Sequence, residues 1–195
     1  MFDPNKDPFE NFDQLLKSAT DQKIPEANAM ALATVNQKGV PSVRTVYLKE
    51  VSQGGFVFYG NYKSHKGQDI EHNPHVCLNF YWPAIWQQVR VTGVAEKVSA
   101  EQSDAYFKSR PRLSQIGAWA SNQSSEIPNH QHLILRVQEY ERQFDGQEVP
   151  RPPHWGGWRV IPSEIEFFFG LTGRLHERYL YQRDNGSWKT KILSP

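Results

Sequence analysis

Apolar residues follow a helical spacing at the start of the chain. Phe9, Phe12 and Leu16 lie three or four positions apart, which places their side chains on one face of a helix. Asp7 and Pro8 come just before this stripe, where an aspartate caps a helix and a proline fits its first turn. The sequence therefore predicts a helix that begins at this pair.

Alternating apolar and polar residues, separated by turns with glycine or proline, predict a succession of short strands. We expect strands at 29–35, 42–51, 56–60, 75–82 and 86–98, and again at 159–161, 164–169, 174–182 and 187–193. Helices are expected at 64–72, 99–110 and 129–144, and a proline-rich connector at 146–157. Many short strands with tight turns favour a barrel or sandwich, so we predict an α+β fold, a mainly antiparallel β-barrel with flanking helices.

Composition limits the class of protein. A chain of 195 residues is long enough to bury a core without disulfides, so we interpret 1–195 as a single domain. Its 22 lysines and arginines against 21 aspartates and glutamates give a net charge of +1, which favours neither nucleic acid nor an anionic membrane. No apolar run approaches the ~18 residues of a membrane span, and the first residues carry no apolar signal core, so we expect a cytoplasmic protein.

Several common chemistries lack their sequence signatures. The chain has no glycine-rich loop of the Rossmann or P-loop type, no Gly-x-Ser-x-Gly elbow and no His-Glu-x-x-His helix. The histidine pairs 72/75 and 130/132 lack a recognisable set of carboxylate or thiolate co-ligands, so no metal site is predicted. Cys77, the single cysteine, lies in an alternating run and is interpreted as a buried thiol.

Two segments in the first half of the chain carry cations suited to anions. Arg44 and Lys49 lie at the two ends of one predicted strand, and strict alternation puts them on opposite faces unless the strand bends. In residues 59–66 a glycine permits a close turn, and Lys66 lies at a helix N-terminus, which is a natural phosphate site. The alternative for both segments is ordinary surface and helix capping.

Two later segments add further cations. Tyr106 and Arg110 are four positions apart on one helix face, where a hydroxyl and a guanidinium suit a phosphate. Arg174, His176 and Arg178 alternate along a predicted strand, so all three would project from the same face. Arginine forks and a histidine that titrates near neutral pH indicate a site for an anionic substrate. The alternative is a solvated strand face.

An ordered set of motifs carries a more specific resemblance. The motifs are Ser109-Arg110-Pro111-Arg112, Ser114-Gln115-Ile116-Gly117-Ala118-Trp119, Gln123-Ser124-Ser125, Trp155-Gly156-Gly157, and Glu166-Phe167 followed by Arg174-Leu175-His176-Glu177-Arg178. With them the chain resembles the pyridoxine (pyridoxamine) 5′-phosphate oxidase family from about Asp7 to Pro195. The resemblance implies an FMN-binding split β-barrel and a homodimer with FMN at the subunit interface. Residues 150–195 would form its dimerisation and active-site segment. The implied reaction oxidises pyridoxamine or pyridoxine 5′-phosphate to pyridoxal 5′-phosphate, with O2 reoxidising the flavin to give H2O2.

The same resemblance implies roles for individual residues of this chain. Those expected to bind FMN are Arg44, Thr45, Val46, Tyr47, Leu48, Lys49, Tyr59, Gly60, His65, Lys66, Gln88, Gln123, Ser124, Phe168 and Arg178. Those expected to bind the substrate are Lys49, Tyr106, Arg110, Ser114, Arg174 and His176. Arg174 and His176, over the pyridine ring of the substrate, are also the expected catalytic residues.

Three departures from the family pattern bear on the site. His65 stands where the family often has arginine, Phe168 where it usually has tryptophan, and residues 1–6 hold no arginine or tyrosine to match its N-terminal lid. We expect retained activity with a more open site, and FMN binding that weakens at high pH because His65 holds phosphate through a charge only when protonated. Two alternative functions are a related flavin oxidase of the phenazine-biosynthesis kind, and a non-catalytic protein that binds flavin or pyridoxal phosphate.

Overall fold

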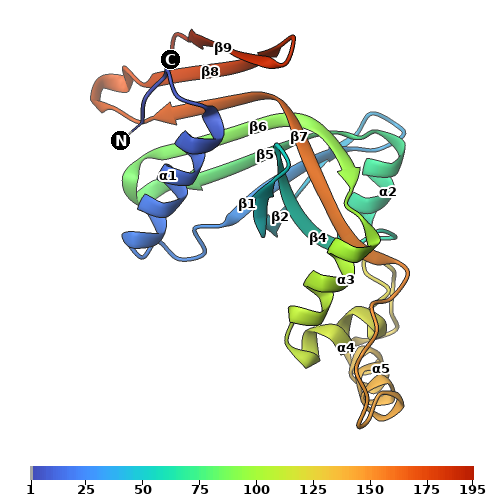
Figure 1. The fold of residues 1–195 in the computed structure, drawn as a ribbon. Coiled ribbons are helices and arrows are strands. Elements are labelled where there is room, and N and C mark those ends of the chain that lie inside the picture. Colours follow the sequence, from blue (N-terminus) through green and yellow to red (C-terminus); the bar gives the residue numbers. More distant parts are fainter. Residues whose placement is uncertain (1) are drawn as a thin grey trace.

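The computed structural model describes residues 2–195, so residue 1 of the predicted domain lies outside the described residues. A nine-stranded antiparallel sheet curls into a barrel, and helices flank it (Figure 1). The strands are β1 (Ala29–Val35), β2 (Pro41–Tyr47), β3 (Glu50–Ser52), β4 (Gly55–Asn61), β5 (His75–Trp82), β6 (Gln87–Lys97), β7 (Trp155–Phe169), β8 (Glu177–Asp184) and β9 (Ser187–Ile192). The helices are α1 (Pro8–Asp21), α2 (His65–His72), α3 (Ala100–Ser109), α4 (Arg112–Ala120) and α5 (His130–Gln143), with 3₁₀ turns at Pro83–Ile85 and Thr172–Arg174. The predicted α+β fold with a mainly antiparallel barrel is confirmed.

Strand β7 pairs with three other strands, because its partner on one side changes along its length. Residues 155–160 pair with β4, whereas residues 164–169 pair with β8. The change falls at Pro162, which has no backbone N–H and is tolerated where a ladder is interrupted. Opposite it, Gly93 of β6 marks a shift in the register between β6 and β7, and a Cβ there would lie 2.2 Å from a backbone oxygen of β7. The prediction of two separate strands is wrong here, because a proline that resembles a break instead lies within one strand of 15 residues.

Two further predicted boundaries differ from the structure. The predicted strand 42–51 is divided, since β2 ends at Tyr47 and β3 begins at Glu50. Lys49 lies in the bend between them, where its backbone N–H donates to Val57. Helix α4 is absent from the sequence prediction, because the proline that serves as its N-cap residue also ends the preceding helix.

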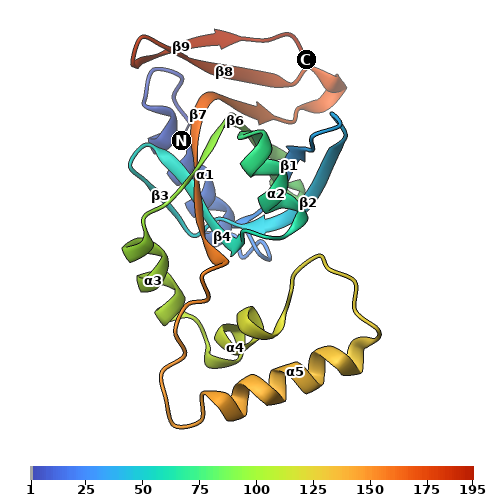
Figure 2. The same cartoon turned by 90° about the vertical axis from the view of Figure 1, so that its right-hand side faces the viewer.

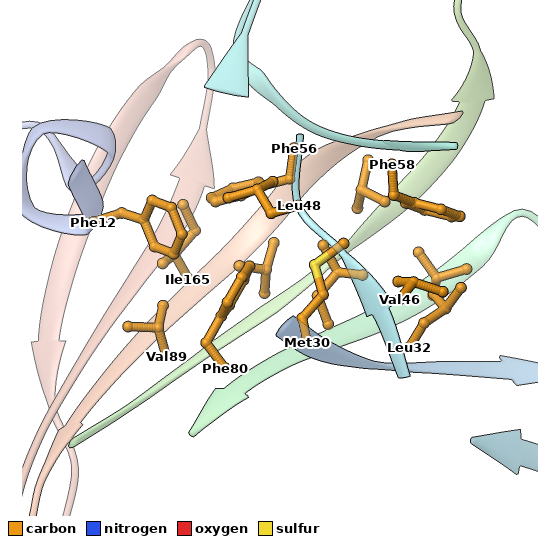
Figure 3. Packing of buried hydrophobic residues seen from close by; sticks show 14 of the residues in the cluster. Phe12, Met30, Leu32, Val46, Leu48, Phe56, Phe58, Phe80, Val89 and Ile165 are labelled. Atoms are coloured by element: carbon orange, nitrogen blue, oxygen red, sulfur yellow. The ribbon is translucent and has the colours of Figure 1, made fainter. Parts of the chain in front are cut away.

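The apolar core fills the inside of the curled sheet (Figure 3). Phe12 of α1 packs edge-on against Phe56 of β4 and Phe80 of β5, with ring centroids 4.9 Å apart in both pairs. All three side chains are fully buried, and each such burial contributes on the order of 2 kcal/mol. The predicted helix start is confirmed, because the Asp7 side chain accepts a hydrogen bond from the Phe9 N–H.

Helices α3, α4 and α5 form a separate layer at one end of the barrel, and the β8–β9 hairpin lies at the other end (Figures 1 and 2). A second, smaller apolar cluster holds the helical layer together. Its buried members are Phe107, Ile116, Phe144, Val149 and Trp155. Because Trp155 is the first residue of β7, this cluster attaches the helical layer to the barrel.

The N-terminal residues are anchored at the hairpin end of β7. The ring of Phe2 lies within 5.1 Å of the rings of Phe167, Phe169 and Tyr179, measured between centroids. Nearby, the backbone oxygen of Pro4 accepts a hydrogen bond from the hairpin. Across the described residues no helix is both long enough and apolar enough to cross a bilayer.

Candidate active site

A cavity of about 790 Å³ opens between the barrel and the helical layer. Its volume falls within the roughly 300–1,000 Å³ typical of small-molecule sites. The residues predicted to bind FMN or substrate that line it are Thr45, Val46, Tyr47, Lys49, Tyr59, Gly60, Lys66, Tyr106, Arg110, Ser114 and Gln123. Side chains from distant parts of the chain therefore meet here, in the combination that the resemblance implies.

Lys66 presents an uncompensated charge to this cavity. It lies in the first turn of α2, whose N-cap residue Ser64 accepts a hydrogen bond from the Gly67 N–H. The Lys66 ammonium donates to Ser64 Oγ at 3.2 Å and to Gln123 Oε1 at 3.0 Å, and no described carboxylate pairs with it. Burial, and then the charge of Arg44, lowers the pKa of Lys66 to about 8. A buried ammonium beside a helix N-terminus is well suited to a phosphate.

Arg44 is near that lysine but is not among the residues that line the cavity. Its Nη1 donates to Thr34 Oγ1 at 2.7 Å, and the Thr34 hydroxyl donates to Asp69 Oδ2 at 2.6 Å. The same carboxylate lies 3.7 Å from Arg44 Nη2. Burial lowers the pKa of Arg44, and the Asp69 charge acts in the opposite direction. Arg44 therefore shares its charge with a carboxylate, whereas Lys66 does not.

Three other residues predicted to bind FMN lie beside the cavity rather than in its wall. Leu48 is buried in the barrel core. The side chain of His65 lines a neighbouring hollow together with Asp69. The backbone N–H of His65 donates to Ser124 Oγ at 3.3 Å, and Ser124 has a positive φ of 72°. His65 and Ser124 thus lie close together next to the Lys66 end of the cavity.

A second polar group of the cavity lies where α3 meets α4. Tyr106 belongs to α3, Arg110 is the C-cap residue of that helix, and Ser114 lies in the first turn of α4. The Lys49 ammonium is 5.9 Å from the centroid of the Tyr106 ring. Nη1 of Arg110 is buried and has no hydrogen-bond partner among residues 2–195. A buried, unpartnered guanidinium N–H beside two hydroxyls and an ammonium fits an anionic ligand.

Stacked aromatic rings form the wall beside Arg110. Tyr59 stacks on Tyr106 with ring centroids 3.9 Å apart, and Trp155 stacks on Tyr59 at 5.7 Å. Gly157 permits this approach, since a Cβ there would lie 2.7 Å from Tyr59 Cε1. Burial is the main cause that raises the pKa of Tyr59 to about 12. The sequence analysis did not assign Trp155 to the site. The two glycines that follow it were the sequence signal that could have indicated close packing around this tryptophan.

A second group of predicted FMN-binding residues lies across β6, β7 and β8. Gln88, Phe168 and Arg178 are direct cross-strand neighbours in that order. Arg178 Nε donates to Glu166 Oε1 at 2.8 Å, and this hydrogen bond raises the pKa of Arg178. Glu166 of β7 is buried and also pairs with Arg90, so one carboxylate links arginines on β6 and β8, the two strands that flank β7 here.

Arg174 and His176 lie in the turn that precedes β8. Arg174 ends a 3₁₀ turn with a positive φ of 61°, so the prediction that it shares a strand face with His176 and Arg178 is wrong: β8 begins only at residue 177. The His176 ring lies 4.8 Å from the Phe168 ring, measured between centroids. The Leu171 N–H donates to His176 Nδ1 at 3.0 Å, which places the proton of a neutral imidazole on Nε2.

The residues that line the cavity and the residues near β8 lie at opposite ends of β7. Trp155 lines the cavity at the start of β7, whereas Phe168 lies near its end, roughly 40 Å further along the strand. Figure 2 shows the helical layer and the β8–β9 hairpin on opposite sides of the barrel. The residues that do not line the cavity of their own chain include Gln88, Phe168, Arg174, His176 and Arg178.

The donor set of the cavity fits FMN. Lys66 and Arg110 are buried or half-buried cations, and neither has a carboxylate partner among the described residues. Such cations are stabilised by an anionic ligand, and FMN carries a phosphate together with a flat ring that suits an aromatic wall. Within residues 2–195 no group of three or more His, Cys, Asp or Glu side chains could hold a metal ion.

Sequence comparison shows close relatives. The family model described as pyridoxamine 5′-phosphate oxidase matches residues 16–144, and the one described as the pyridoxine 5′-phosphate oxidase C-terminal dimerisation region matches residues 155–195. A Bdellovibrio bacteriovorus protein named pyridoxine/pyridoxamine 5′-phosphate oxidase is 74% identical over 196 residues, covering 100% of both chains. A Nostoc punctiforme protein of the same name is 50% identical over 189 residues, covering 96% of this chain and 88% of its own.

Solved structures share the fold. PhzG from Burkholderia lata 383, in complex with tetrahydrophenazine-1-carboxylic acid, matches with a TM-score of 0.93 at 30% identity over 99% of this chain and 95% of its own. A pyridoxamine 5′-phosphate oxidase-related, FMN binding protein from Nostoc punctiforme PCC 73102 matches with a TM-score of 0.77 at 16% identity, over 98% and 100%.

The fold and the cavity define an FMN-binding split β-barrel. The chain belongs to the pyridoxamine 5′-phosphate oxidase family, whose members are oxidoreductases. Membership of this family supports FMN as the cofactor, and the match to the dimerisation region supports a homodimer.

Proposed function

We propose that this protein oxidises pyridoxamine 5′-phosphate and pyridoxine 5′-phosphate to pyridoxal 5′-phosphate. The observation that carries the proposal is the presence of two separate cationic groups in one cavity. One group is Lys66 at the start of α2, and the other lies where α3 meets α4 and includes Arg110. Two such groups suit two phosphates, one on FMN and one on the substrate. The name of the 74%-identical relative supports the same reaction.

Lys66 is the main charge for the FMN phosphate in this proposal. Gln123 already accepts a hydrogen bond from the lysine and keeps the ammonium at the cavity wall. Arg44 and Ser124 lie close by, and both offer donors to an anion. The phosphate would therefore meet one uncompensated cation and one that Asp69 partly neutralises.

Arg110 is the main charge for the substrate phosphate. Its buried Nη1–H has no protein acceptor among the described residues, so a phosphate oxygen would supply the missing partner. Tyr106 and Ser114 add hydroxyl donors, and Lys49 adds a second cation. A dianion held by two cations and two hydroxyls gains charge-assisted hydrogen bonds that an unphosphorylated substrate cannot form.

A second chain completes the site in this proposal. Arg174 and His176 of one protomer would face the cavity of its partner, because they lie far from the cavity of their own chain. Arg174 would orient and polarise the substrate, and His176 would donate a hydrogen bond from Nε2. FMN, when bound, supplies the ring that accepts a hydride and passes two electrons to O2, giving H2O2. The amine substrate also takes up water and releases ammonia.

The direct test is to purify the protein, record the flavin spectrum, and measure H2O2 and pyridoxal 5′-phosphate during incubation with pyridoxamine 5′-phosphate. We expect equal amounts of the two products from a yellow dimer. A flavin-loaded dimer that forms neither product with either phosphorylated substrate would defeat the proposal, and would favour a non-catalytic protein that binds flavin or pyridoxal phosphate.

A second candidate function is oxidation of a phenazine precursor. The observation that favours it is the TM-score of 0.93 with PhzG, whose structure contains tetrahydrophenazine-1-carboxylic acid. That ligand has a carboxylate and no phosphate, so it leaves the Lys49, Tyr106, Arg110 and Ser114 group underused. Peroxide formation with a dihydro- or tetrahydrophenazine carboxylate, but not with pyridoxamine 5′-phosphate, would select this alternative.

A further inference from the structure

The arginines around the candidate site are held in two different ways. Arg178 donates to the buried carboxylate of Glu166, and Arg44 lies 3.7 Å from the carboxylate of Asp69. Arg110 has no carboxylate partner among the described residues. Its guanidinium carbon lies instead 4.6 Å from the centroid of the Trp155 ring. The structure thus holds the proposed substrate-phosphate arginine by an aromatic face.

An aromatic face and a carboxylate have different effects on a bound arginine. A carboxylate fixes the guanidinium but cancels its charge and takes up its N–H donors. An aromatic ring attracts the cation through its quadrupole and leaves both the net charge and the in-plane N–H groups available. Nη1 of Arg110 shows this directly, since it is buried and makes no hydrogen bond to any described residue.

Trp155 is itself fixed in position. Its ring is nearly parallel to those of Tyr106, at an interplanar angle of 6°, and Tyr59, at 12°. It meets Phe107 edge-on with ring centroids 5.1 Å apart. The next residue of β7 is Gly156, where a Cβ would lie 2.0 Å from Tyr62 Oη, so the backbone here is tightly packed. The side chain is only 6% exposed, which gives Arg110 a rigid platform.

We infer that Trp155 is a positioning residue for phosphate recognition, acting through Arg110. It orients the guanidinium toward the substrate phosphate without neutralising it, and so favours phosphorylated over unphosphorylated substrates. The inference rests on the proposed function and deepens it, because it names the side chain on which discrimination for the phosphate depends.

The test compares the FMN-loaded dimers of Trp155→Leu and Trp155→Phe with the unchanged protein. Leucine removes the aromatic face, whereas phenylalanine keeps a smaller one. We expect Trp155→Leu to raise KM for pyridoxamine 5′-phosphate about tenfold or more with kcat changed by less than about twofold, and Trp155→Phe to show a smaller rise. The dissociation constant of the product, pyridoxal 5′-phosphate, should rise in parallel, while that of unphosphorylated pyridoxal stays within about twofold.

Trp119→Leu is the matched control. Trp119 lies in the same helical layer and packs on Tyr140 and Phe144, and its indole N–H donates to the Pro150 carbonyl, so it makes no ring contact with Arg110. The same substitution there should leave KM for the phosphorylated substrate within about twofold.

A double-mutant cycle with Arg110→Gln decides whether Trp155 acts through the arginine. In the Arg110→Gln background, either Trp155 variant should add little to the rise in KM, because the group being positioned is gone. The inference would be overturned if the two substitutions had additive effects on KM, or if affinity for pyridoxal fell as much as affinity for pyridoxal 5′-phosphate. Either result would leave the proposed oxidation intact. If Trp155→Leu does not fold, the cycle with Trp155→Phe is judged by the same rule. Absence of oxidation by the unchanged protein would instead count against the proposed function, and the two binding constants would still test Trp155.

Discussion

The cavity and the β6–β8 face both carry positive side chains, but they treat the charge differently. In the cavity, Lys66 and Arg110 have no carboxylate partner among the described residues. On the β6–β8 face, buried Glu166 pairs with both Arg90 and Arg178. An uncompensated cation is available to a ligand, whereas a paired cation mainly fixes neighbouring strands relative to each other. The comparison separates cations that are available to bind an anionic ligand from cations that hold strands in position.

Glu166→Gln should produce the largest loss of stability. It leaves two arginines without their shared buried carboxylate, which in a fully buried setting costs about 3–5 kcal/mol. The side chains of Arg90 and Arg178 are 44% and 26% exposed, so solvent moderates the loss to roughly 2–4 kcal/mol. Urea unfolding measures this change. Glu164→Gln is the matched control, since among residues 2–195 the Glu164 side chain accepts a hydrogen bond only from Gln182. Equal losses of stability in the two variants would contradict the special role of Glu166.

Arg174→Ala should produce the largest loss of turnover. If Arg174 polarises the substrate in the transition state, its removal lowers kcat by about 100-fold or more and leaves the FMN content unchanged. Stopped-flow reduction of the bound flavin by pyridoxamine 5′-phosphate measures the step directly. Arg183→Ala is a suitable control, because Arg183 stacks on Trp188 in the hairpin. Loss of FMN from the Arg174 variant, with normal turnover of the remaining holoenzyme, would contradict the assigned role.

Lys66→Met should weaken FMN binding rather than turnover. A charge-assisted hydrogen bond contributes about 1.5–3 kcal/mol, so the dissociation constant of FMN should rise roughly 10- to 100-fold. Titration of the apoprotein, followed by quenching of flavin fluorescence, gives this constant. Lys63→Met, at an exposed lysine three residues earlier, should change it little. Unchanged FMN affinity in Lys66→Met would show that the phosphate lies elsewhere.

FMN affinity should also fall as the pH rises above about 8. Burial lowers the pKa of Lys66 to about 8 in the unliganded protein, and a bound phosphate dianion would raise it again. Binding above this pH therefore takes up a proton, and the dissociation constant should rise by up to about tenfold per pH unit between about pH 8 and 9.5. Lys66→Arg, which stays charged, should give a flat profile over this range. A similar slope in both proteins would assign the effect to a group other than Lys66.

The alternation of apolar and polar residues predicted several barrel strands well, because apolar residues in a strand with one buried face recur at every second position. The strands predicted at 29–35 and 75–82 coincide with β1 and β5, whose side chains alternate between buried and less buried positions. Proline was less informative. Pro162 looked like a break and lies inside β7, since its missing N–H falls where the strand changes partner. Local residue type does not show where a ladder is interrupted.

The candidate site was predictable in part. The local sequence marked Lys66 and Arg110 as candidates for anion binding, but only the fold brings them to one cavity. Arg174 was misplaced because its positive φ is imposed by the turn before β8, and non-glycine residues rarely reveal such a conformation in advance. Trp155 was missed because it lies within the predicted proline-rich connector. Its role depends on rings contributed by β4 and α3.

The placement of the two residue groups at opposite ends of β7 makes subunit complementation possible. A chain damaged at Arg110 and a chain damaged at Arg174 carry their defects on different halves of the site. In a mixed two-fold dimer, both defects would fall in one site and the other site would be intact. Unfolding and refolding an equal mixture of two inactive variants should therefore restore about a quarter of the normal activity. A site built from one chain alone would restore none.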